Sequence, residues 1–175
     1  MQDGISAHAP FGAVASARTG ITFRPITPAD MDFMRQLYAS TREEELAPVP
    51  WPEEAKQHFL AEQFALQHHH YQTYHAQADL LLILRGTEPI GRIYIDRANA
   101  EIGLIDIALT RANRGHGIGT ALLAELVDEG QRAARVIELY VEPNNPARRL
   151  YERFGFGLVE NRGVYDFMRW TPATK

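Results

Sequence analysis

The chain has 175 residues, of which 45% are hydrophobic and 23% charged, so we expect one globular domain with a single core. Its 18 Lys and Arg residues and 22 Asp and Glu residues give a net charge of −4 without a basic block, which argues against nucleic acid as a partner. The absence of cysteine excludes disulfides, thiolate metal sites and a cysteine nucleophile.

Residues 1–20 are rich in Ala, Gly and Ser, and they lack the basic patch and long apolar run of a targeting segment. We predict a flexible N-terminal tail over these residues and a folded domain over 21–171. No later segment reaches the roughly 20 apolar residues that cross a bilayer. The sequence therefore predicts a cytoplasmic protein without a membrane partner.

The first half of the domain reads as one strand followed by two helices. Residues 21–26 alternate between apolar and polar types, which is typical of a strand. Thr27 and the proline after it resemble a helix start, which predicts a helix from residue 28 to about 40. After a break at 47–52, apolar residues at helical spacing predict a second helix over 53–74.

The second half contains most of the predicted sheet. Residues 79–85 and 90–97 flank a Gly-containing turn and predict a hairpin, and a third strand follows over 101–109. A helix and then a further strand come next, which implies a right-handed crossover and a parallel pair. The fold class is therefore α+β, with a mixed sheet of about seven strands. The remaining predicted elements are a helix at 117–130, a strand at 135–142, a helix at 145–154 and strands at 156–160 and 164–170.

A glycine-rich turn, RANRGHGIGT at residues 111–120, lies directly between an apolar strand and an amphipathic helix. Glycines at a helix N-terminus let backbone N–H groups turn inward and bind phosphate, and Arg114 adds a positive charge. A tight turn that only permits close packing is the alternative. A nucleotide P-loop is disfavoured because Thr120, not lysine, follows Gly119, and the dinucleotide fingerprint would need a different position in the chain.

Arg114, Gly117 and Gly119 match the signature R-x-x-G-x-G of the GCN5-related N-acetyltransferase (GNAT) family, which this chain resembles. Residues 104–109 are similar to the family's splayed central strand, and NNPARRLYERFGF at 144–156 is similar to its second motif. Both motifs occur in the family's order between residue 101 and about 170. The resemblance implies a single GNAT-like domain, with helices on both faces of the sheet, that transfers an acetyl group from acetyl-CoA to an amine.

The resemblance also implies where acetyl-CoA binds. Backbone N–H groups of the glycine turn would hold the pyrophosphate, and the main chain of residues 107–109 would pair with the pantetheine arm. A splayed strand leaves N–H and C=O groups that such an arm can satisfy. The implied cofactor-binding residues are Ile107, Ala108, Leu109, Arg114, Gly115, His116, Gly117, Ile118, Gly119, Thr120, Asn144 and Ala147. Asn145, by contrast, precedes a proline and fits a helix N-cap.

Acetyl transfer needs a neutral amine, an oxyanion stabiliser and a proton for the departing thiolate. Tyr151 matches the tyrosine that protonates the thiolate in many family members, and a core tyrosine is the alternative. Glu101 lies in the register where histone-type members carry a glutamate base, although an exposed strand-start carboxylate would look the same. Asp106 competes for this role, because a carboxylate in an apolar strand is either paired or functional and burial would raise its pKa. In a strand without a bulge these two carboxylates lie on opposite faces, so we expect them not to act together.

The remaining candidates concern partners. His68, His69 and His70 are consecutive on a predicted helix and point in different directions, so we expect no metal site. Residues 42–45 and Trp51 fall where family members commonly build the acceptor pocket. The expected acceptor is a small-molecule or peptide amine, and dimerisation, common in the family, makes a homodimer one predicted partner. A non-catalytic acyl-CoA-binding sensor or interaction module on the same fold is the alternative function.

Overall fold

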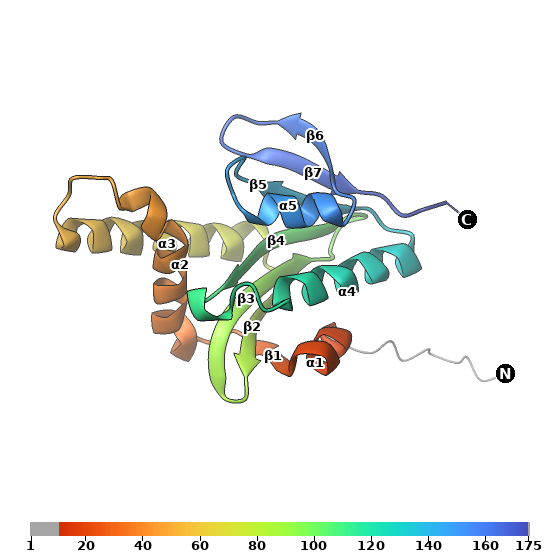
Figure 1. Ribbon diagram of the computed structural model, residues 1–175, viewed down its shortest axis with the longest axis horizontal. Coiled ribbons are helices and arrows are strands. Elements are labelled where there is room, and N and C mark those ends of the chain that lie inside the picture. The colour runs from red at the N-terminus through yellow and green to blue at the C-terminus, as the bar shows by residue number, and fades with distance from the viewer. Residues whose placement is uncertain (1–10, 175) are drawn as a thin grey trace.

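The structure is a computed structural model that describes residues 11–174. It is a seven-stranded mixed sheet with helices on both faces, so the predicted α+β fold is confirmed (Figure 1). The strands are β1 (Ile21–Pro25), β2 (Asp79–Arg85), β3 (Glu88–Asp96), β4 (Ile102–Leu109), β5 (Ile137–Val141), β6 (Gly157–Asn161) and β7 (Asp166–Trp170). The helices are α1 (Ala13–Thr19), α2 (Met31–Leu46), α3 (Glu53–Tyr74), α4 (Ile118–Ala133) and α5 (Ala147–Arg153), with short 3₁₀ turns at Pro28–Asp30 and Arg111–Asn113.

The strands follow the order β1-β2-β3-β4-β5-β7-β6. Neighbours from β1 to β4 are antiparallel, as are β5 with β7 and β6 with β7. The parallel pair is β4 with β5, and α4 connects them along the chain. This pair confirms the crossover that the sequence predicted.

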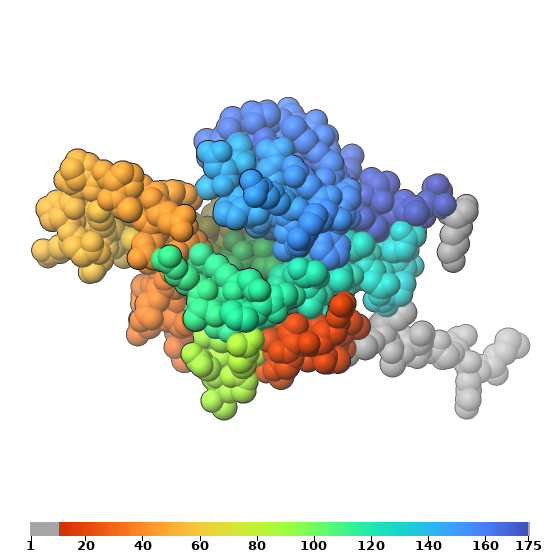
Figure 2. Space-filling view, viewed as in Figure 1, coloured from red at the N-terminus to blue at the C-terminus, as the bar shows by residue number. Residues whose placement is uncertain are grey.

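Alternate residues of the strands face two separate apolar clusters. Ile93 and Ile95 of β3 point to the face that α1, α4 and α5 cover, whereas Tyr94 points to the face covered by α2 and α3. In α3, only Phe64 is buried among 22 residues, and Figure 2 shows the α2–α3 segment projecting from the body of the protein. Within residues 11–174, no helix combines the length and the apolar character needed to cross a membrane.

The boundaries predicted for α3 and β2 are confirmed, but α2 continues to Leu46 instead of ending near residue 40. Its extension carries Arg42. The Arg42 guanidinium donates to the carboxylate of Glu142 at 2.7 Å, although the two residues are 100 positions apart in the chain. The predicted cap at Thr27 is present, because its backbone N–H and hydroxyl both donate to Asp30, but it caps the 3₁₀ turn Pro28–Asp30 and α2 itself begins at Met31. Beside it, the Arg24 guanidinium holds the pKa of the Asp30 carboxyl well below its usual range.

The prediction of a flexible tail over residues 1–20 is wrong for residues 11–20, and residues 1–10 lie outside the described part. Ala13–Thr19 form α1, whose Ala15 is fully buried against the body of the fold. The buried carboxylate of Glu125 in α4 accepts hydrogen bonds from the backbone N–H groups of Gly12 at 2.7 Å and Ala15 at 2.9 Å. Local composition could not reveal α1, because its N-terminal donors are satisfied by a residue about 110 positions away.

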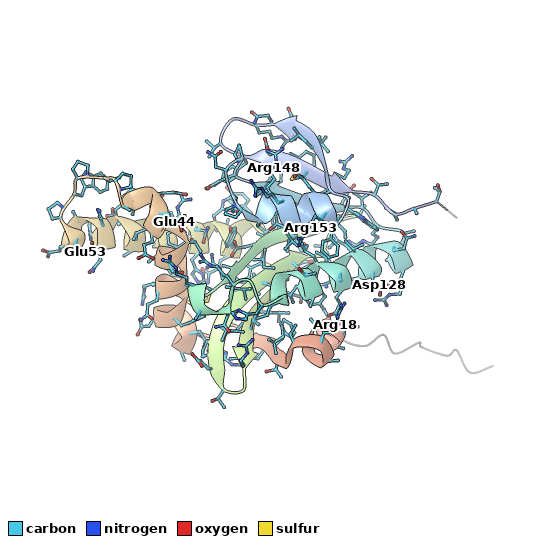
Figure 3. The ribbon with its side chains drawn as sticks, viewed as in Figure 1. Arg18, Glu44, Glu53, Asp128, Arg148 and Arg153 are labelled. Atoms are coloured by element: carbon cyan, nitrogen blue, oxygen red, sulfur yellow. The ribbon has the colours of Figure 1, made fainter. Side chains whose placement is uncertain are left out.

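We predict that Glu125→Ala lowers the free energy of unfolding by about 2 kcal/mol, because the charge-assisted hydrogen bonds that hold α1 are lost. Calorimetry should record a fall in Tm of roughly 4–8 °C for a chain of this length. The matched control is Asp128→Ala in the same helix, since Asp128 lies on the outer side of α4 in an exposed ion pair (Figure 3). If the Glu125→Ala protein has the same Tm as the Asp128→Ala protein, this account is contradicted.

Candidate functional site

The parallel pairing of β4 with β5 covers three residue pairs, the last of which joins Leu104 to Leu139. Beyond Leu104, the main chain of β4 continues to Leu109 without a partner in β5, while its other edge still pairs with β3. The predicted splayed strand is therefore present. Its free edge offers N–H and C=O groups to an extended ligand.

A β-bulge lies where β4 leaves β5. Asp106 faces Tyr94 of β3 and Leu104 faces Ile95, so Ile105 is an extra residue in β4. An extra residue reverses the alternation of side chains, and Asp106 therefore lines the same cavity as Glu101. The expectation that these two carboxylates lie on opposite faces is wrong for this reason.

The glycine turn forms the N-terminus of α4, as predicted. Gly117 is the N-cap, with a φ of 78° that favours glycine, and Gly115 has a φ of 75°. The first backbone N–H groups of a helix have no partner within the helix, so this end of α4 carries free donors and the positive end of the helix dipole. The Arg114 side chain bends back to donate to the Leu109 carbonyl at 2.9 Å, which joins the turn to the splayed end of β4.

A cavity of about 810 Å³ opens between this turn, the splayed end of β4 and α5; we call it the turn cavity. The guanidinium-bearing residues Arg111, Arg114 and Arg153 line it together with the apolar Leu123 and Leu150. Eleven of the twelve predicted cofactor residues line the turn cavity, and His116 does not. The eleven are Ile107, Ala108, Leu109, Arg114, Gly115, Gly117, Ile118, Gly119, Thr120, Asn144 and Ala147.

A second cavity, of about 760 Å³, lies between α2, α3 and the sheet. Four tyrosines from separate segments of the chain line it besides Tyr151, and we call it the tyrosine cavity. Of the residues singled out for an acceptor pocket, Arg42 and Glu45 of α2 line it, whereas Glu43 and Glu44 line the turn cavity and Trp51 lines neither. The four tyrosines are Tyr38, Tyr71, Tyr140 and Tyr165.

Tyr151 lies where the two cavities meet, because it lines both. It is 6% exposed and packs on Phe156, so the same side chain is part of the hydrophobic core and also lines the site. Burial, together with the nearby Asp106 carboxylate, raises the pKa of Tyr151 well above its usual range. Its hydroxyl therefore keeps its proton at neutral pH and is available as a donor.

Asp106 is engaged in an ion pair that sequence reasoning missed. Arg92 of β3 donates to it from Nε at 2.5 Å, and the same guanidinium donates to Gln67 of α3 at 2.9 Å. The Arg92 side chain is only 3% exposed. Burial acts to lower the pKa of Arg92, but the Asp106 carboxylate together with Tyr94 and Tyr71 raises it by more, so the pKa of Arg92 is raised. The charged residue in the apolar strand is thus paired, and the signal that could have revealed it is the arginine in the neighbouring strand β3.

Glu101 has a different environment from Asp106. It is exposed, it lines the tyrosine cavity, and within the described residues its carboxylate makes no hydrogen bond. Its backbone carbonyl accepts a hydrogen bond from Arg135 at 3.0 Å, which fixes the start of β4. Of the two carboxylates that the sequence singled out, Glu101 is the one that is free to accept a proton.

The histidines around the end of α3 have separate partners. His68 stacks on Phe64, and burial lowers its pKa. His75, which follows α3 and lines the tyrosine cavity, contacts Asp96 through Nδ1 at 2.8 Å. Among residues 11–174, no three His, Asp or Glu side chains come together to hold a metal ion.

Residues 32–156 match the family model described as the acetyltransferase (GNAT) family, so the chain belongs to that family. The mycothiol acetyltransferase of Corynebacterium glutamicum (strain R) is 32% identical over 96 residues, 53% of this chain and 33% of the relative. The mycothiol acetyltransferase of Corynebacterium efficiens is 35% identical over 100 residues, 54% of this chain and 33% of the relative. The chain thus spans about a third of the length of these curated relatives.

Among solved structures, the PaiA N-acetyltransferase of Thermoplasma acidophilum in complex with coenzyme A has a TM-score of 0.66 and 18% identity. The match covers 86% of this chain and 98% of that one. At this level of identity the likeness shows the fold, which agrees with the family match.

Proposed function

We propose that this protein transfers an acetyl group from acetyl-CoA to an amine by direct attack. The observation that carries the proposal is the junction of the turn cavity with the tyrosine cavity at Tyr151. One cavity has a helix N-terminus suited to binding phosphate and a free strand edge, and the other has room for a second molecule. Two reactants entering from opposite sides would meet at this residue.

The residues of the turn cavity fit acetyl-CoA. The N-terminus of α4 would bind the pyrophosphate through backbone N–H groups, with Arg111, Arg114 and Arg153 supplying positive charge. The free edge of Ile107–Leu109 would pair with the amides of the pantetheine arm. Acetyl-CoA supplies the activated thioester. Exposed His116 lies outside the cavity wall, so we leave it out of the proposed binding set.

The remaining chemistry falls to side chains of the protein. Glu101 is the proposed carboxylate base that accepts a proton from the amine, directly or through one water. Tyr151 is the proposed acid that donates its proton to the departing thiolate. Asp106, paired with Arg92, lies near Tyr151, and its carboxylate helps to keep the Tyr151 hydroxyl protonated. The acceptor is a small-molecule or peptide amine, and the homodimer and the cytoplasmic location remain predictions.

The test of the function is thiol release from acetyl-CoA in the presence of lysine, spermidine, kanamycin or an Ala–Ala peptide. These amines represent amino acids, polyamines, antibiotics and protein N-termini. Amine-dependent thiol release together with an acetylated product supports the proposal. Acetyl-CoA binding without turnover on any amine would favour the sensor alternative.

We predict that saturating acetyl-CoA stabilises the fold by about 2.7 kcal/mol at a hundredfold excess over Kd, which is a Tm shift of roughly 5–10 °C. Gly117→Val should abolish most of this shift, because a β-branched residue strains the left-handed backbone of the α4 N-cap. The matched control is Gly86→Val, which carries the same strain in the β2–β3 turn, away from both cavities. Equal acetyl-CoA affinity of the two variants in calorimetry would refute the assigned site.

For the base, Glu101→Gln should lower kcat/KM most at low pH, where an unassisted amine is least often neutral, and rising pH should partly restore it. The measurement is a pH profile of thiol release. Asp106→Asn is the comparison, because it leaves Arg92 without its carboxylate and should chiefly lower stability. If a folded Asp106→Asn protein alone shows a loss that high pH rescues, the base is Asp106.

For the acid, Tyr151→Phe should lower the single-turnover rate by about 10²–10⁴-fold with little change in acetyl-CoA affinity. Single turnover with excess enzyme isolates chemistry from product release. The matched control is Tyr94→Phe, since Tyr94 is a buried tyrosine outside both cavities, and it should cost stability but little rate. A folded Tyr151→Phe protein that retains more than about a third of the wild-type rate would return Tyr151 to a purely structural role.

A further inference from the structure

The tyrosine cavity contains a histidine–carboxylate pair that the proposed reaction does not use. His75 caps the C-terminus of α3, and its Nδ1 lies 2.8 Å from Oδ2 of Asp96, the last residue of β3. The other oxygen of Asp96 accepts the backbone N–H of Ala98 at 2.9 Å. Both side chains line the cavity, and both are largely buried.

This geometry determines which nitrogen of the ring can accept a proton. The two hydrogen bonds lower the pKa of Asp96, with the larger effect from His75, so Asp96 is a carboxylate and accepts hydrogen bonds only. Neutral His75 therefore carries its hydrogen on Nδ1, which leaves a lone pair on Nε2. Within the described residues, Nε2 has no hydrogen-bond partner. The ring centroids of His70 and Tyr71 each lie 6.2 Å from the ring centroid of His75, so these two rings limit the movement of the imidazole.

We propose that His75, oriented by Asp96, is a second proton acceptor for the amine that enters the tyrosine cavity. The proposal rests on the proposed function. Nε2 of His75 takes a proton from the ammonium group, directly or through a water in the same cavity. The amine lone pair then forms the bond to the acetyl carbon, the carbon–sulfur bond breaks with its electron pair going to sulfur, and Tyr151 protonates the thiolate. The second amine proton returns to Tyr151, and the imidazolium releases its proton to solvent.

Two proton acceptors of different chemistry would each act over a different pH range. An ordinary imidazole has a pKa of about 6.5 and an ordinary Glu side chain one of about 4.3. A base acts best when its pKa lies near the working pH, so the imidazole is the better acceptor near neutrality. At low pH an ordinary imidazole is protonated, so a carboxylate is then the remaining acceptor. This division agrees with the low-pH loss expected for Glu101→Gln.

Several titratable groups face His75 and must be considered in any pH profile. Asp96 approaches from β3, His70 and Tyr71 from α3, and Glu101 from the residue before β4 in the same cavity. The Asp96 carboxylate lies 2.8 Å from Nδ1, and His75 stands at the C-terminal end of α3. Tyr71 keeps its proton, because burial raises its pKa.

The experiment is a pH profile of kcat/KM with the fastest amine of the panel named above. Wild-type protein should show a rise to a plateau near neutral pH. His75→Gln should lose that inflection, with a loss of about 10²-fold near pH 7.5 that shrinks towards low pH, where Glu101 acts. His69→Gln is the matched control, since His69 lies on α3, the helix that His75 caps, is exposed and does not line either cavity.

Asp96→Asn separates orientation and charge from a merely structural role. Removal of the carboxylate disfavours the imidazolium, so the inflection should move to lower pH by about one unit. The NMR titration of the His75 ring should move in the same direction and by a similar amount. This second measurement needs only folded wild-type and Asp96→Asn protein, so it holds even where His75→Gln does not fold.

The outcomes distinguish a failure of the proposed role of His75 from a failure of the proposed acetyl transfer. Wild-type protein that releases no thiol with any amine overturns both. Active wild-type protein, together with a folded His75→Gln variant that keeps the inflection and about half or more of the neutral-pH activity, overturns only the role of His75. An Asp96→Asn variant that leaves the ring titration unchanged also overturns it.

Discussion

The separation of β4 from β5 after Leu104 is the feature on which both cavities depend. A parallel pair that continued to Leu109 would close the sheet and leave no free backbone at the glycine turn. Because the strands diverge, α5 can place Tyr151 in the gap, and the N-terminus of α4 can face the free edge of β4. The two cavities therefore meet along the splayed end of β4 and the start of α5, where Ala108, Ala147 and Tyr151 line both.

The bulge at Ile105 and the Arg92–Asp106 ion pair belong to this arrangement. The bulge changes which face of the sheet the later residues of β4 occupy, and it brings Asp106 opposite Tyr94. A carboxylate placed there needs a partner, because an unpaired charge in a largely apolar environment is costly. Arg92 supplies that partner from β3, and Gln67 of α3 holds the guanidinium. The sheet and the helix that cover the tyrosine cavity are thus joined by polar contacts at its wall.

Comparison of sequence and structure shows which features a local pattern can carry. The boundaries of α3 and β2, the N-cap at Thr27 and the glycine turn before α4 were predictable, because each follows from hydrophobic periodicity or from residue types that favour caps and turns. The residues of α1 were assigned to a tail because composition in that segment is uninformative. Its donors are satisfied by Glu125, and no local pattern contains that contact.

The sequence by itself determined the order of the elements from β1 onwards, the glycine turn at the start of α4 and the family resemblance, because these depend on residues close together in the chain. Only the tertiary structure decided that Asp106 is paired with Arg92, that Glu101 is free, and that His75 meets Asp96. Each of these outcomes depends on a contact between separate elements or on a bulge. Such features arise from the pairing of strands and the packing of helices, which the identity of a single residue does not encode.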